Sequence, residues 1–230
     1  MAGSLSTKET HLPLTMRFAM GRNGKTDTSP PDLAHEAQLS AKGFRMIAGV
    51  DEAGRGPLAG PVVASAVIIL DPQSLSGVTD SKALSAKRRE AFFARITAGA
   101  LVGIGVSPVL SIERTDIRKA SLCAMARALS ALPVKADAAL IDGRDTPNTD
   151  IPCEALIGGD GKSLSIAAAS VVAKVWRDRI MDALAVRHPT FGWQTNRGYG
   201  SKAHMAALIE TGPSAHHRRT FAPVRAALEG

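Results

Sequence analysis

Residues 45–70 read RMIAGVDEAGRGPLAGPVVASAVIIL, and this stretch decides the fold. A first apolar run ends at Val50 and is followed by two adjacent carboxylates, Asp51 and Glu52, and then by the turn GRGP at 54–57. A second apolar run fills 62–70. Short runs rich in Val and Ile and bounded by Gly and Pro are typical of buried strands. The stretch therefore predicts two buried strands, with the acids where the first strand stops and a loop begins.

The composition indicates a globular protein with a polyanionic partner. The 230 residues are 45% hydrophobic, which is enough for one domain with a substantial core. Lys and Arg number 28 against 21 Asp and Glu, giving a net charge of +7 and a pI near 9.8. Nucleic acid is the first polyanion to consider. No apolar stretch approaches the ~20 residues of a membrane span, so no membrane partner is expected.

The two cysteines, Cys123 and Cys153, form no C-x-x-C motif and are expected to be small buried hydrophobes. A reducing cytosol fits this usage, and we expect a cytoplasmic monomer. Residues 1–31 are polar, broken by Gly and Pro and without sustained periodicity, which predicts a disordered N-terminal extension. An organelle transit sequence is the alternative, because this segment holds basic residues and few acids.

Strand and helix patterns alternate through residues 32–230. Apolar runs predict strands at 46–50, 62–70, 101–106, 138–141 and 153–157. Periodicity and capping residues predict helices at 33–42, 86–96, 111–132, 165–185 and 202–211. Small residues at 167–170 predict that the fourth of these helices packs closely against the sheet. The expected fold class is α/β: one mixed sheet flanked by helices, with a small helical C-terminal appendage at about 187–230.

Two later strands also deliver an acid beside glycine, namely Asp142 and Asp160. Carboxylates gathered in one pocket repel one another, and a divalent cation removes that cost. All-oxygen ligation is what Mg²⁺ or Mn²⁺ prefers, and two such ions suit phosphodiester hydrolysis. Any one of these acids alone is typical of an ordinary turn, but together they favour a site. Asp51 and Glu52 share it only if their strand ends or bends, because neighbouring strand residues face opposite ways.

Several other residues have both a functional and an ordinary interpretation. The glycines of the turn at 54–56 either make a tight turn or let backbone groups approach a ligand. Lys82, Lys174 and Arg177 are candidate phosphate contacts, although isolated basic residues are often only solvated. Tyr199 is either a stacking platform for a sugar or base or a surface aromatic. Residues 216–219, which read HHRR, are expected to form a basic surface rather than a zinc site.

These motifs together resemble bacterial ribonuclease HII. The resemblance covers about residues 36–229, and its opening motif at 48–60, AGVDEAGRGPLAG, is highly specific. Further matches lie at 80–85, 141–143, 159–160, 168–174, 198–199 and 216–224. The resemblance implies a ribonuclease H-like fold and endonucleolytic cleavage of RNA in RNA/DNA hybrids. It also implies cutting 5′ of single ribonucleotides embedded in duplex DNA, with 3′-hydroxyl and 5′-phosphate ends, as in ribonucleotide excision repair.

The resemblance also implies roles for individual residues. The catalytic acids would be Asp51, Glu52, Asp142 and Asp160, of which the first three are the usual ligands of Mn²⁺ or Mg²⁺. The turn would read the ribonucleotide 2′-OH through its backbone, and Tyr199 would stack on the neighbouring deoxyribose. The substrate-binding residues expected on this basis are Gly54, Arg55, Gly56, Lys82, Ser170, Lys174, Arg177 and Tyr199.

The chain departs from the family pattern in three places. Residues 196–201 read NRGYGS where family members often have HKGYPT, so the loop that carries Tyr199 is expected to be more flexible. Gly159 and Gly161 stand where lysine and serine are common, and Ala167 replaces a frequent serine. None of these changes removes an acid, so we expect activity with an altered metal preference.

Two alternatives remain open. A non-catalytic protein that binds RNA/DNA hybrids would keep the basic surface and Tyr199 without productive metal ligation. Another metal nuclease on the same fold would keep the acids and cut DNA. The complete set of four acids argues against the first alternative, and the turn at 54–56 argues against the second.

Overall fold

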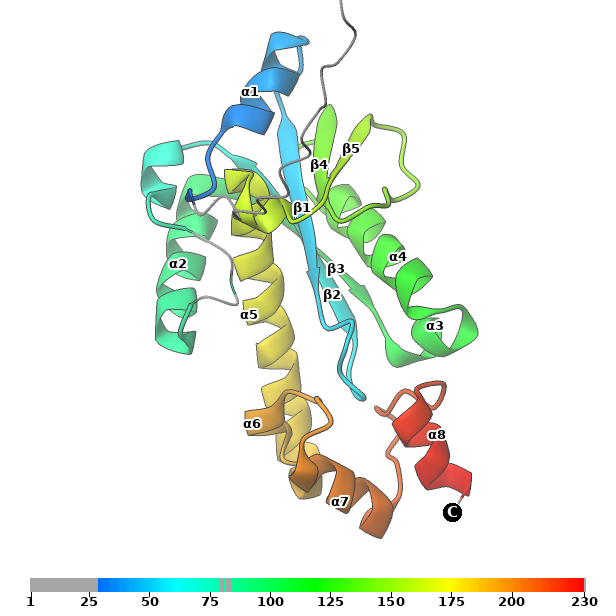
Figure 1. Ribbon diagram of the computed structural model, residues 1–230. Helices are drawn as coiled ribbons and strands as arrows, with labels where there is room; N and C mark the ends of the chain where they lie inside the picture. The colour runs from blue at the N-terminus through cyan, green and yellow to red at the C-terminus, as the bar shows by residue number, and fades with distance from the viewer. Residues whose placement is uncertain (1–28, 79–80, 82–83, 230) are drawn as a thin grey trace, which may run out of the picture.

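The apolar runs pair into one five-stranded sheet with the order β3-β2-β1-β4-β5 (Figure 1). This computed structural model describes residues 29–78, 81 and 84–229. The strands are β1 (Ile47–Ala53), β2 (Val62–Ile69), β3 (Ala100–Ser107), β4 (Ala138–Asp142) and β5 (Cys153–Leu156). β1, β2 and β3 pair antiparallel, whereas β4 and β5 run parallel to β1. The predicted mixed sheet is therefore confirmed; the predicted N-terminal extension at 1–31 lies almost wholly outside the described residues.

β1 differs from the prediction in where it ends. The antiparallel ladder with β2 continues past the acids to the pair Ala53↔Val63. The parallel ladder with β4 stops earlier, at the pair Val50↔Ile141. The expectation that the strand stops at Asp51 was therefore wrong: β1 stays extended there because β2 continues to pair with it.

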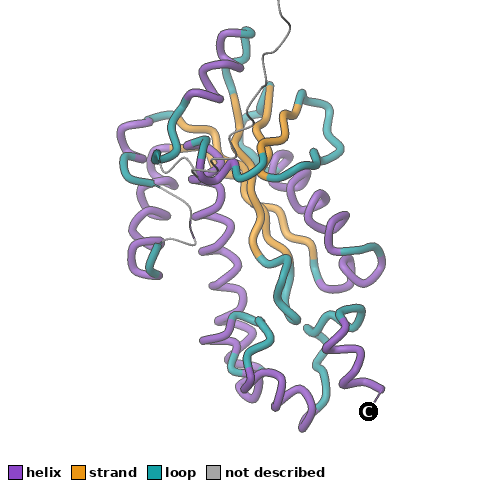
Figure 2. The backbone as a smooth tube through the Cα atoms, in the orientation of Figure 1, coloured by secondary structure: helices purple, strands orange, loops and turns teal. Residues whose placement is uncertain are grey.

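Helices cover both faces of the sheet (Figure 2). α5 (Leu164–Arg187) and α2 (Ala86–Gly99) pack on one face, and α4 (Ile117–Ser130) packs on the other. The small residues at the start of α5 allow the close approach predicted for them, because a Cβ on Gly49 of β1 would lie 2.2 Å from the Ser165 carbonyl carbon. The remaining elements are α1 (Ala34–Ala41), η1 (Pro72–Leu75), α3 (Val109–Arg114), η3 (Gly159–Gly161), η4 (Pro189–Phe191), α6 (Trp193–Asn196), α7 (Lys202–Thr211) and α8 (Ala222–Glu229).

The helix predicted at 111–132 is divided into α3 and α4. Asp116 lies between them in extended backbone, and its carboxylate accepts a hydrogen bond of 2.7 Å from the backbone N–H of Lys119. An aspartate that caps a new helix competes with continuation of the old one, which explains the break. Cys123 on α4 is exposed and Cys153 is half-buried, so the prediction of two buried cysteines was wrong. No helix among the described residues has the length and apolarity needed to cross a membrane.

Residues 188–229, called here the C-terminal helical part, pack on the end of α5 and on the loop that follows β1 (Figure 1). The predicted basic surface at 216–219 was wrong for its two middle residues, whereas Arg219 is exposed as expected. His217 is 1% exposed within this part, and Arg218 is 0% exposed because it is buried against the loop at 54–61. The adjacent aromatic rings of Phe191 and Trp193 cover His217, with ring centroids 4.6 and 5.3 Å away.

A hydrogen-bonded histidine pair links two segments of the C-terminal helical part. His204 Nε2 lies 3.0 Å from His217 Nε2 and accepts a hydrogen bond of 3.1 Å from the indole N–H of Trp193. His204 Nδ1 lies 2.8 Å from the Tyr199 carbonyl, to which it donates. His217 Nδ1 accepts from the backbone N–H of Ser214 at 3.0 Å. Both rings can be neutral, with His217 Nε2–H donating to His204 Nε2, whose single lone pair is then shared with the indole N–H of Trp193.

This pair generates a pH prediction. Burial, reinforced by the neighbouring histidines, lowers the pKa of His217 to about 4, and burial lowers the pKa of His204 as well. Because the folded pKa lies below the unfolded value, the stabilisation is complete above the ordinary pKa of 6.5 and is lost as the pH falls toward 4. Urea unfolding should therefore show His217→Asn destabilising the protein more at pH 7.5 than at pH 4.5, by on the order of 2 kcal/mol. An equal effect at both pH values would contradict the neutral pair.

Candidate metal centre and substrate pocket

The parallel pairing of β1 and β4 brings two carboxylates together. The register pairs Val50 with Ile141, so the next residues, Asp51 and Asp142, lie side by side just beyond the ladder. Carboxyl ends of parallel strands share one edge of a sheet, and β5 ends at the same edge. Two residues that are far apart in the sequence therefore present their acids at one place.

The third acid comes from the short helix η3, which follows β5. The backbone N–H of Gly159 donates a hydrogen bond of 2.7 Å to Asp142 Oδ1, and this contact ties η3 to the end of β4. Asp160 lies in η3 and is 9% exposed. One carboxylate oxygen from each of Asp51, Asp142 and Asp160 lies within 4.8 Å of the other two. This set is called here the three-acid group.

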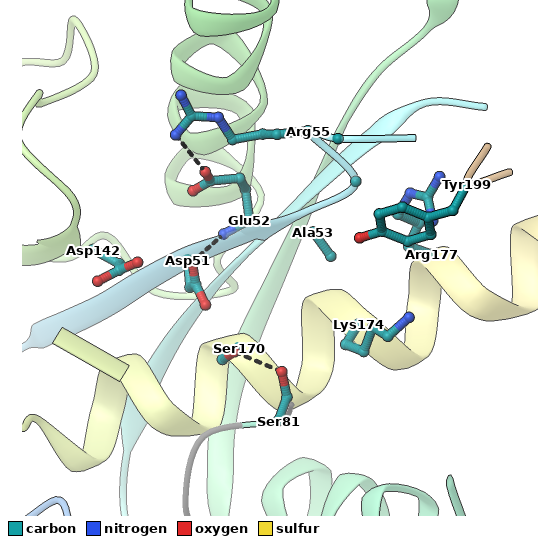
Figure 3. A pocket seen from close by; sticks show the side chains of 12 residues that line it. Asp51, Glu52, Ala53, Arg55, Ser81, Asp142, Ser170, Lys174, Arg177 and Tyr199 are labelled. Atoms are coloured by element: carbon teal, nitrogen blue, oxygen red, sulfur yellow. Dashed lines mark hydrogen bonds and ion pairs between the residues drawn. The ribbon is translucent and has the colours of Figure 1, made fainter. Parts of the chain in front are cut away.

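Glu52 faces away from the three-acid group, as strand alternation requires. Figure 3 shows the Glu52 side chain turned toward α4 and that of Asp51 turned toward α5. Glu52 Oε1 accepts a hydrogen bond of 3.1 Å from Arg55 Nη1, whereas Glu52 Oε2 is buried without a hydrogen-bond partner among the described residues. Glu52 nevertheless borders the same cavity as Asp51 and Asp142. The ligand role expected for it stays a prediction.

The electrostatics of these acids call for a cation. Burial raises the pKa of Asp51 well above its usual range, and the negative charges of Glu52 and Asp142 raise it further. Burial also raises the pKa of Glu52, although Arg55 opposes this rise. Oxygen-only donors at this spacing, together with the unpartnered Glu52 Oε2, fit a hard divalent ion such as Mg²⁺ or Mn²⁺. Such an ion would offset the repulsion that the fold imposes on the acids.

Asp51, Glu52 and Asp142 line a cavity of about 280 Å³, which is also lined by most of the predicted substrate-binding residues. The turn at 54–56 forms one wall, and Ser170 and Lys174 of α5 form another (Figure 3). Tyr199 is 50% exposed at the rim, and a Cβ on Gly56 would lie 3.4 Å from its ring. The cavity therefore joins an acidic end, a glycine-rich wall and an aromatic rim.

The basic residues predicted to contact phosphate differ in their surroundings. Lys174 lines the cavity and forms an ion pair of 2.7 Å with Asp178. Arg177 is 1% exposed and all its side-chain hydrogen bonds end on backbone carbonyls. Lys82 lies outside the described residues. Arg177 thus shapes the wall of the cavity, while Lys174 presents its charge to it.

Sequence reasoning missed two residues of this site. Ser81 lines the cavity, and its hydroxyl lies 2.9 Å from that of Ser170. The sequence motif at 80–85 contains nothing that distinguishes the serine from its basic neighbour. Arg218 is buried beneath the turn and bonds its carbonyls. Its place in a run of basic residues favoured a surface position, so the sequence held no signal for its burial.

Comparison with known proteins gives a consistent result. A sequence model described as Ribonuclease HII matches residues 48–224. The chain is 47% identical over 230 residues to ribonuclease HII of Nitrobacter hamburgensis, covering 100% of this chain and 86% of the relative. It is 51% identical over 195 residues to ribonuclease HII of Cereibacter sphaeroides strain KD131, covering 84% of this chain and 92% of the relative.

Solved structures support the same fold. Ribonuclease H2 from Pyrococcus horikoshii superposes with a TM-score of 0.68 at 26% identity, covering 80% of this chain and 98% of that one. The structure of the PCNA:RNase HII complex from Archaeoglobus fulgidus gives a TM-score of 0.67 at 27% identity, covering 77% and 95%. The predicted ribonuclease H-like fold is therefore confirmed.

The three-acid group predicts that divalent cations stabilise the protein. Millimolar Mn²⁺ should raise the melting temperature by about 5 °C relative to EDTA, because an ion bound only by the folded state stabilises it. Asp142→Asn should melt higher than the parent in EDTA, since it removes repulsion, yet gain little from Mn²⁺. Asp150→Asn changes an exposed acid outside the group and should respond like the parent. If Mn²⁺ raises the melting temperature of Asp142→Asn as much as that of the parent, the three-acid group is not the metal site.

Proposed function

Because the chain belongs to the ribonuclease HII family and is a ribonuclease H endonuclease, we propose that it cuts 5′ of single ribonucleotides embedded in duplex DNA. It would also hydrolyse the RNA strand of RNA/DNA hybrids, leaving 3′-hydroxyl and 5′-phosphate ends. One observation carries this proposal. Asp51 and Asp142 of the three-acid group and the turn at 54–56 line a single cavity, so phosphate chemistry and sugar recognition would occur within one nucleotide's reach.

The acids define the reacting end of the cavity. Asp51, Asp142 and Asp160 would hold the divalent cation, and Glu52 would add its unpartnered oxygen from the other face of β1. When bound, Mg²⁺ or Mn²⁺ lowers the pKa of an attacking water and offsets the charge that develops on phosphate. β1, β4 and η3 fix the carboxylates before substrate arrives, so little rearrangement is needed during the reaction.

The glycine-rich wall supplies the selectivity for ribonucleotides. Gly54 and Gly56 have no side chains, so a sugar can approach the peptide groups of the turn closely. A ribose 2′-OH can hydrogen-bond there, whereas a deoxyribose leaves the same groups unpaired. Lys174 would contact a phosphate of the bound strand, and Ser170, on the same helix, would contact the nucleotide beside the acids.

Two expectations from the sequence stay predictions. The protein is proposed to act as a monomer in the cytoplasm, in keeping with ribonucleotide excision from chromosomal DNA. The Archaeoglobus structure is of a complex with PCNA, which makes a sliding clamp a candidate partner for this chain too.

Cleavage of a DNA duplex with one ribonucleotide tests the function. We expect a cut on its 5′ side in Mg²⁺ or Mn²⁺, no cut in EDTA and no cut in an all-DNA duplex. Asp142→Asn should lower the rate at least about 100-fold, because the metal loses a charged ligand. Asp150→Asn should cut at the parent rate. Binding without cutting in either metal would favour the hybrid-binding alternative, and cutting of all-DNA duplex would favour another metal nuclease.

Tyr199 generates a separate prediction about binding. Its ring is half-exposed beside Gly56, where it can stack on a sugar or base. Tyr199→Ala should weaken binding of the ribonucleotide-containing duplex by ~1–3 kcal/mol, and Tyr199→Phe should keep most of the affinity because it retains the ring. Fluorescence anisotropy in EDTA measures this without cleavage. If Tyr199→Ala and Tyr199→Phe both bind the duplex as tightly as the parent does, Tyr199 is only a surface aromatic.

A further inference from the structure

Two fully buried arginines lie beneath the turn at 54–56 and its continuation to Pro61. Arg218, from the C-terminal helical part, donates to the carbonyls of Arg55 at 2.9 Å, Gly54 at 2.5 Å and Gly60 at 2.9 and 3.0 Å. It also reaches the Pro61 carbonyl at 3.3 Å. Among the described residues, every side-chain hydrogen bond of Arg218 therefore ends on the backbone of this one loop.

Arg177 completes the arrangement from α5. Its guanidinium donates to the carbonyls of Ala59 and Pro61, each at 3.2 Å, and to that of Arg197 at 3.1 Å. A Cβ on Gly54 would lie only 2.0 Å from Arg177 Nε, so the loop rests directly on this side chain. Through Arg197 the same guanidinium also holds the segment that carries Tyr199.

The carbonyls that accept hydrogen bonds from Arg218 determine where the N–H groups of the turn point. The chain has no cis peptide bond among its described residues, so each carbonyl and the N–H of the next residue point in opposite directions. Arg218 turns the carbonyls of Gly54 and Arg55 inward. The N–H groups of Arg55 and Gly56 must then point away from Arg218. Both residues line the substrate cavity.

Backbone contacts lock this loop to its neighbours on both sides. The N–H of Leu58 donates to the Gly198 carbonyl at 2.8 Å, and the N–H of Gly60 donates to the His216 carbonyl at 2.9 Å. The N–H of Arg218 returns a hydrogen bond of 2.8 Å to the Leu58 carbonyl. These hydrogen bonds fix the turn and the segment that carries Tyr199 relative to each other, and Arg218 lies at the centre of this arrangement.

A guanidinium is suited to this task because it offers five N–H donors in a rigid plane and no acceptor. Neither arginine forms an ion pair with any described residue, so neither is occupied by a carboxylate. A lysine ammonium has three donors around a point and cannot serve four carbonyls in fixed positions. The chemistry of both side chains is therefore directed at the loop's backbone.

We propose that Arg218, supported by Arg177, is a positioning residue that sets ribonucleotide specificity by aiming the N–H groups of Arg55 and Gly56 at the 2′-oxygen. Arg218 touches neither substrate nor metal in this proposal. It rests on the proposed function, because it assumes that the turn reads the 2′-OH. Its distinctive consequence is that losing Arg218 removes the discrimination between ribose and deoxyribose, not simply the stability of the fold.

The test is a double-mutant cycle that combines a substitution of Arg218 in the protein with removal of the 2′-OH from the duplex. Binding in EDTA is measured by anisotropy for a duplex with one ribonucleotide and for the same duplex entirely of DNA. The parent should prefer the ribonucleotide about tenfold, the value of one or two good hydrogen bonds. Arg218→Met keeps the volume without the donors, and its preference should fall to about one- to twofold. Arg218→Lys should give an intermediate preference.

A matched control separates positioning from stability. Leu129→Ala removes a buried side chain of α4, far along the chain from the loop, and should lower the melting temperature while keeping the full preference. If Arg218→Met does not fold, the intermediate preference of Arg218→Lys decides. A folded Arg218 variant that keeps the parent's preference overturns the proposal. If the parent itself shows no preference, the reading of the 2′-OH by the turn fails, and the proposal fails with it.

Discussion

The repulsion among buried carboxylates is the constraint on which this structure depends. Asp51, Asp142 and Asp160 have oxygens within 4.8 Å of one another, and burial together with neighbouring charge raises the pKa of Asp51. A chain would not gather such groups spontaneously. The parallel ladder of β1 and β4 and the hydrogen bond from Gly159 to Asp142 hold them in place. The core therefore maintains an arrangement whose cost a bound cation offsets, which explains why stability and activity are both expected to depend on metal.

The second requirement of the proposed function, selectivity for the sugar, would be met by backbone rather than by side chains. Peptide groups read a 2′-oxygen only if their direction is fixed, and glycine-rich turns are intrinsically free to rotate. The C-terminal helical part supplies the missing rigidity through Arg218 and through the neutral pair of His204 and His217. The helices at the end of the chain thus have a role at a site whose acids and turn lie between residues 51 and 160.

Much of this could be predicted from sequence because it depends on local pattern. Apolar runs predicted the strands to within a few residues, and acids at the ends of three predicted strands favoured a shared site. The break before α4 was missed because apolar periodicity continues across Asp116 and outweighs one capping residue. The burial of His217 and Arg218 was missed because charge suggests a surface, and only tertiary contacts reveal partners for such groups. Strand alternation explains why the side chains of Asp51 and Glu52 point to opposite faces of the sheet. The sequence could not show this, because it does not reveal that β1 continues to Ala53.

The most direct measurement is a crystal structure of the protein grown or soaked in Mn²⁺, with anomalous data collected to locate the ion. The account predicts an anomalous peak bonded to carboxylate oxygens of Asp51, Asp142 and Asp160. It predicts no comparable peak at exposed acids such as Asp150. A fully soaked crystal with no peak between the three carboxylates, or with the ion held elsewhere in the cavity, would contradict the claim that a cation offsets their repulsion.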